Sequence, residues 1–71
     1  MEYDVILTCE GKKWTAEVPA LPGCVTWGSS RAEVLELAEE AVTAWIASRR
    51  RLGKPVPGRK QAIELAKVRV G

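Results

Sequence analysis

The sequence predicts a two-layer α+β domain with the order β-β-β-α-β, in which one helix packs on one face of a small sheet. Three observations predict this fold. Short segments with a two-residue apolar period fill residues 3–27, a stretch with three- and four-residue apolar spacing covers 31–51, and an alternating segment closes the chain at 59–71. Because the chain has only 71 residues, we expect a single domain over 1–71 with a thin core.

The first two strands are expected to form a hairpin. Apolar residues alternate from Tyr3 to Cys9 and again from Trp14 to Val18. The intervening residues 10–13 read Glu-Gly-Lys-Lys, a turn in which Gly11 can take a positive φ. One face of this sheet packs on the helix, so the other is left to water or to another molecule.

The connection to the third strand is rich in proline and glycine and reads VPALPGCVTWG over residues 18–28. Pro19 has no N–H for a ladder and ends the second strand, and Pro22-Gly23 fits the centre of a type II turn. Residues 24–27 form a short third strand that Gly28 ends. We interpret the motif as structural, since such residues restrict the backbone. The alternative is a direct contact of Leu21 or Pro22 with a partner.

A helix is predicted from about Arg31 to Arg51. Ser30 and Glu33 have the spacing of a capping box, in which each side chain satisfies a backbone donor of the other residue. Gly53, followed by two prolines, ends the helix. An apolar stripe recurs at helical spacing along it, at Val34, Leu35, Ala38, Ala41, Val42, Trp45 and Ile46.

The last segment, residues 59–71, has two interpretations. Ile63 and Leu65 alternate on one parity, and Val68 and Val70 alternate on the other. A strand with a bulge near Ala66 fits this pattern, as does a short helix over 59–67 that leads into a strand. We favour the strand, placed beside the first strand of the sheet. Such an apolar edge invites pairing, so we expect a homo-oligomer, a dimer or a tetramer, held together through the C-terminal strand.

Composition argues against an enzyme. The chain is 46% hydrophobic, contains no histidine and has two cysteines, Cys9 and Cys24, which we expect to be small buried residues. Two-metal phosphodiester cleavage needs converging carboxylates, and Asp4 is the only aspartate. We therefore expect no catalysis, cofactor or metal. No apolar run is as long as a membrane span and the start does not resemble a signal peptide, so we expect a cytoplasmic protein.

Charge divides the sequence into an acidic and a basic part. Residues 1–48 carry eight acidic side chains against three basic ones, and residues 49–71 carry eight basic side chains against one acidic. Either part is a candidate partner surface. On the acidic side we predict partner binding by Glu36 and Glu40 together with Trp27, against the simpler interpretation of a solvated helix face. On the basic side the alternative is a phosphate-binding patch at Arg49, Arg50, Arg51, Lys54, Arg59 and Lys60. The simpler interpretation of that patch is charge that compensates the helix dipole.

The motifs in combination resemble the HicB-like antitoxin family. They are Val18-Pro19-Ala20-Leu21-Pro22-Gly23-Cys24 with Gly28, the helix start with Ser30 and Glu33, and the exit Gly53-Lys54-Pro55-Val56-Pro57. The resemblance implies a partial RNase H-like fold and a protein that binds and neutralises a small basic HicA-type RNA-cleaving toxin. Ala20 stands where the family often has Asp. Many members also carry a C-terminal DNA-binding domain that residues 1–71 do not include, so we do not expect operator binding from these residues.

The sequence thus predicts a non-catalytic antitoxin-like binding module. The alternative is a stand-alone oligomeric regulatory module that binds nucleic acid through its basic C-terminal segment.

Overall fold

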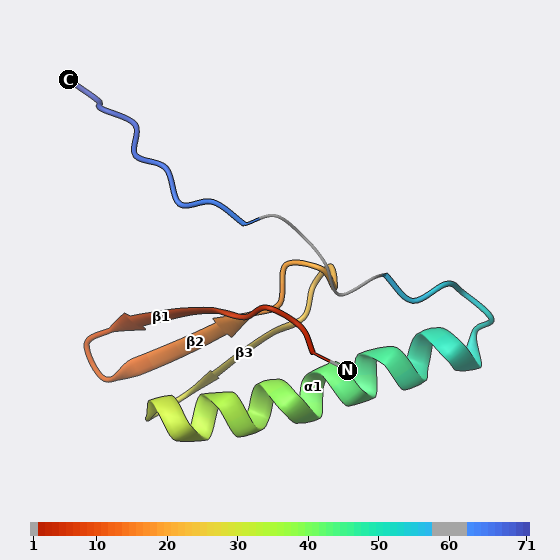
Figure 1. Ribbon diagram of the computed structural model, residues 1–71. Coiled ribbons are helices and arrows are strands. Elements are labelled where there is room, and N and C mark those ends of the chain that lie inside the picture. The colour runs from red at the N-terminus through yellow and green to blue at the C-terminus, as the bar shows by residue number, and fades with distance from the viewer. Residues whose placement is uncertain (1, 58–62) are drawn as a thin grey trace.

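The computed structural model describes residues 2–57 and 63–71, and its core is one sheet covered on one face by one helix (Figure 1). Strands β1 (Ile6–Glu10), β2 (Lys13–Glu17) and β3 (Val25–Gly28) form an antiparallel sheet in the order β1-β2-β3, and helix α1 (Arg31–Arg51) follows. The predicted α+β fold with three strands before one helix is confirmed.

The hairpin forms where the pattern predicts it. Gly11 in the turn has φ +64°, and the register pairs Leu7 with Ala16 and Glu10 with Lys13. On the other side of β2, Ala16 pairs with Thr26. Directly paired residues point to the same face of a sheet, so this register decides which side chains meet the helix.

Helix α1 begins and ends at the predicted residues because both ends are capped. The Ser30 hydroxyl accepts a hydrogen bond from the Glu33 N–H at 3.1 Å. The Glu33 carboxylate accepts a hydrogen bond from the Ser29 N–H at 2.9 Å. In a standard capping box the donor would be the N–H of the N-cap residue, Ser30. At the other end Gly53 has φ +70°, and its N–H donates to the Arg50 carbonyl at 3.1 Å.

The core consists of two small clusters along the interface between helix and sheet. In the first, Ala16 of β2 packs on Val34 and Ala38 of α1. The second gathers residues of the connection between β2 and β3 and lies nearer the C-terminal half of α1. Its buried members are Val18, Leu21 and Cys24, and Tyr3, Val5, Ala41, Val42 and Trp45 pack against them.

The helix covers the sheet unevenly. Its backbone lies closest to β3 and β2, whereas β1 meets the first core cluster through the Leu7 side chain. The expectation that Cys9 is buried is wrong: Cys9 lies near the hairpin end of β1, and its thiol is exposed and donates to the Gly11 carbonyl at 3.5 Å. Cys24 is buried as expected.

The predicted fourth strand does not form in the described part of the C-terminal segment. Residues 63–71 form neither a strand nor a helix and are exposed throughout. The segment leads away from the sheet (Figure 1). Its placement beside the first strand is therefore wrong for these residues, and residues 59–62 lie outside the described part. A segment with this alternation forms a strand only when a neighbouring strand supplies partners for its backbone N–H and C=O groups, and no strand of the described residues lies beside it.

Candidate partner-binding surfaces

The proline-rich connection consists of two consecutive β-turns. The Leu21 N–H donates to the Val18 carbonyl and the Cys24 N–H donates to the Leu21 carbonyl, each at 3.0 Å. Pro19 and Pro22 occupy the second position of these turns, where a fixed φ is favourable. Gly23 has φ +81°, which the third position of a type II turn requires.

This connection is fastened to the helix. The Leu21 side chain is 0% exposed, and the Trp45 indole N–H donates to the Pro22 carbonyl at 3.0 Å. Leu21 is thus a core residue whose side chain a partner does not reach, and Pro22 is exposed at the surface of the turn.

Gly28 lies where β3 meets the helix start. A Cβ atom at this position would be 2.7 Å from the Glu33 carboxylate oxygen and 3.2 Å from the Val34 nitrogen. A side chain at residue 28 would therefore press on the helix backbone and displace the Glu33 carboxylate from the Ser29 N–H.

An acidic surface lies along the exposed side of α1. Glu36, Glu39 and Glu40 surround a shallow depression continued by Thr43 and Ala47, and all of these residues are exposed. Among the described residues, the hydrogen bonds of the helix carboxylates are confined to Glu33. Glu36 and Glu40, both predicted as partner-binding residues, therefore share one surface. We call Glu36, Glu39 and Glu40 the acidic face. The prediction omitted Glu39, although its spacing of three from Glu36 places it there.

Trp27 lies on the opposite side of the molecule. Ala16 and its partner Thr26 face the helix, so Trp27, one residue further along β3, faces outward. The indole is 65% exposed, and the Lys13 ammonium lies 5.6 Å from its ring centroid. The structure thus separates Trp27 from the acidic face, and the three predicted partner-binding residues do not form one site.

The basic residues at the end of α1 have different surroundings. The Arg49 guanidinium lies 4.5 Å from the Trp45 ring centroid, and Arg50 lines a groove beside the helix. Arg51 and Lys54 are exposed. The other two predicted phosphate-binding residues, Arg59 and Lys60, lie outside the described residues.

Within residues 2–57 and 63–71, no three side chains of His, Cys, Asp or Glu come together as a metal site. No α-helix in the part of the chain that the structure describes has the length and apolar character needed to cross a membrane. Burial raises the pKa of the Cys24 thiol, so this thiol is less reactive than an exposed one.

Comparison with known proteins identifies the family. The model of a family described as "HicB_like antitoxin of bacterial toxin-antitoxin system" matches residues 3–69. The chain belongs to the HicB-like antitoxin family. It is also 40% identical over 58 residues to UPF0150 protein Ta0767 of Thermoplasma acidophilum, which covers 80% of this chain and 84% of that protein. No solved structure matches the chain.

Membership in the HicB-like family gives the surfaces their context. The family supports an antitoxin role in a toxin-antitoxin system, which implies a toxin as partner and suggests a role in binding rather than in catalysis. The proline-rich turns, Gly28 and the helix cap build the scaffold. The acidic face, the surface around Trp27 and the exposed Arg50, Arg51 and Lys54 remain as candidates for partner contact.

Proposed function

We propose that the chain binds and neutralises a small basic HicA-type RNA-cleaving toxin, and that the acidic face of α1 contacts this toxin. An RNA-cleaving protein needs positive charge to hold the phosphates of its substrate. A surface of carboxylates is complementary to such a protein, speeds the encounter, and occupies the region that RNA would use.

The observation that carries this proposal is the exposure of Glu36, Glu39 and Glu40 together on one side of the helix. Glu33, one turn earlier, is already engaged in capping the helix. The carboxylates of the acidic face make no hydrogen bond to other described residues, so a partner does not have to displace an internal one.

The first test is capture of the partner. The tagged chain is purified from extract of its native cells at moderate salt, in parallel with and without added nuclease, and the co-purifying proteins and nucleic acids are identified. A small basic RNA-cleaving protein in stoichiometric amount supports the proposal. Retention of nucleic acid alone, released by added salt, refutes it and supports the alternative function of the basic segment, because phosphate binding weakens steeply with salt.

The second test locates the surface. The double substitution Glu36→Lys/Glu40→Lys is compared with Glu10→Lys/Glu17→Lys, a matched charge change on exposed positions of the sheet. We expect the helix variant to weaken toxin binding by about 100-fold, at roughly 1–2 kcal/mol for each reversed contact, and the sheet variant to retain binding. Equal loss in both variants would show that only net charge matters.

A further inference from the structure

The C-terminal end of α1 carries positive charge that the proposed function does not use. Arg49, Arg50 and Arg51 lie in the last turn of the helix, and Lys54 follows the turn at Gly53. We call these four cations the basic end. Figure 1 shows the last turns of α1 projecting beyond the sheet, and Arg50, Arg51 and Lys54 are exposed there.

The basic end is not needed to cap the helix, because backbone groups already do so. The Gly53 N–H donates to the Arg50 carbonyl at 3.1 Å, and the Lys54 N–H donates to the Arg49 carbonyl at 2.9 Å. These two bonds are those of a Schellman motif. The dipole of a helix end is equivalent to about half a negative charge, which four positive charges exceed several-fold. Compensation of the dipole therefore does not account for all four cations.

The charge of the basic end is also not neutralised by nearby carboxylates. Among the described residues, the side-chain hydrogen bonds involve none of these four cations. The last carboxylate of the helix is Glu40, which precedes Arg50 by a helical distance of about 15 Å. The basic end is thus open to an anionic partner.

One of the four cations has a defined position. The Arg49 guanidinium lies 4.5 Å from the Trp45 ring centroid, and the Trp45 indole N–H donates to the Pro22 carbonyl at 3.0 Å. Since the indole is itself held in place, the stacked guanidinium is held with it. Stacking engages the face of a guanidinium and leaves its N–H edge for bidentate hydrogen bonds with a phosphate.

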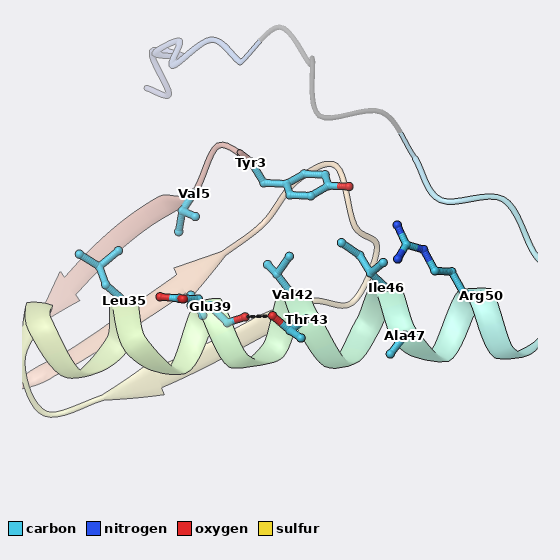
Figure 2. Close-up of a pocket in the computed structure, with 10 residues that line it drawn as sticks. Tyr3, Val5, Leu35, Glu39, Val42, Thr43, Ile46, Ala47 and Arg50 are labelled. Atoms are coloured by element: carbon cyan, nitrogen blue, oxygen red, sulfur yellow. Dashed lines mark hydrogen bonds between the residues drawn. The ribbon is translucent and has the colours of Figure 1, made fainter. Parts of the chain in front are cut away.

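The arrangement of the basic end suits a chain of phosphates better than a single phosphate. Figure 2 shows Arg50 on the side of the helix that faces Tyr3, and Arg49 lies against Trp45 instead. Successive residues of a helix point about 100° apart, so these cations do not converge on one anion. A flat lipid surface would meet only those on one side. The backbone of a nucleic acid presents closely spaced phosphates, so separate cations can each contact one.

We propose that the basic end of α1 binds the phosphodiester backbone of nucleic acid without regard to base sequence. Contacts to phosphates position a protein but carry no sequence information, so this binding is distinct from recognition of an operator. The proposal does not rest on toxin binding, because the acidic face is a separate surface of α1. Its failure would leave the toxin proposal unchanged.

The test measures binding of the full chain by fluorescence anisotropy at several salt concentrations between about 50 and 200 mM. The probes are a random-sequence DNA duplex and a single-stranded RNA of equal length, and binding to either supports the proposal. With about four phosphate contacts, the logarithm of the association constant should fall against the logarithm of salt concentration with a slope of about −3 to −4.

The variant Arg50→Gln/Arg51→Gln/Lys54→Gln locates the surface. We expect it to weaken binding at least about tenfold at low salt and to reduce the steepness of the salt dependence by about 2–3. Arg49 is retained, because its replacement would also remove packing on Trp45. The matched control, Lys12→Gln/Lys13→Gln/Arg31→Gln, removes the same charge from exposed positions elsewhere and should keep the steepness unchanged.

Three results would overturn the proposal. They are no binding of the unaltered chain to either probe at low salt, an equal loss in both triple variants, and equally tight binding of poly-glutamate. The second would show that only net charge matters, and the third that the surface takes acidic polypeptides as readily as phosphates. Far-UV circular dichroism verifies that the variants fold, and Arg51→Gln/Lys54→Gln replaces the triple variant if that chain does not.

Discussion

Replacing Leu21 with alanine should remove a large fraction of the stability of this protein. Its side chain is 0% exposed and is the largest of those that are fully buried. Truncation of a buried leucine to alanine costs about 3–5 kcal/mol, from lost transfer free energy and the cavity left behind. A chain of 71 residues has a free energy of unfolding of about 4–10 kcal/mol, so this change alone brings the domain close to unfolding.

The assay is urea unfolding followed by tryptophan fluorescence, since Trp45 hydrogen-bonds to the carbonyl of Pro22 in the same connection. With a slope of about 1 kcal/mol per molar urea, the midpoint should fall by about 3 M or more. All variants are compared at one protein concentration, because the apparent stability of an associating protein depends on its concentration.

The control is Leu52→Ala, the same chemical change at a side chain that is 65% exposed. It should change the free energy of unfolding by no more than about 0.5 kcal/mol. A loss below about 1 kcal/mol for Leu21→Ala would refute the assignment of Leu21 to the core. The residues of the proline-rich connection would then serve only to form its two β-turns and not to fill the core.

Three further predictions concern Gly28 and the cysteines. Gly28→Ala should lower the free energy of unfolding by about 1–2 kcal/mol in thermal melts, because its Cβ would displace the Glu33 carboxylate that accepts from the Ser29 N–H. The control is Gly71→Ala, where an added Cβ would meet nothing within 4 Å and should have no effect. Equal melting temperatures for the two variants would contradict the close approach at Gly28. In the native protein a thiol reagent should modify Cys9 rapidly and Cys24 only after unfolding, and rapid modification of both would contradict the burial of Cys24. Since burial raises the folded pKa of the Cys24 thiol, its contribution to stability is complete below the pKa of the unfolded thiol, about 8.5, and is lost as pH rises through the folded pKa. When urea unfolding is measured at several pH values, the free energy of unfolding of Cys24→Ala should therefore fall less at alkaline pH than that of the unaltered chain.

Some features of this protein are local enough for the sequence to determine. Ser30 with Glu33 and Gly53 define the ends of α1, and Gly11 and Gly23 mark two turns. Each of these features depends on backbone conformation and hydrogen bonds within a few residues, so neighbouring residues are enough to predict it. The family resemblance was confirmed by the match of the family model to residues 3–69.

Other features depend on which surfaces meet. The sequence pattern places Cys9 on the apolar side of its strand, yet the thiol is exposed, because the helix lies over β3 and β2 and Cys9 is near the hairpin end of β1. Trp27 and Glu36 are close in sequence but lie on opposite sides of the domain, since the register turns Trp27 outward.

The same limit applies to residues 63–71. Their alternation predicts a strand, and the sequence determines that this segment is apolar, but whether it pairs depends on an edge that another part of the fold supplies. Local propensity is encoded in neighbouring residues, whereas coverage of a face requires that distant elements pack together. The tertiary structure therefore decided which residues of this antitoxin-family chain are available to a partner.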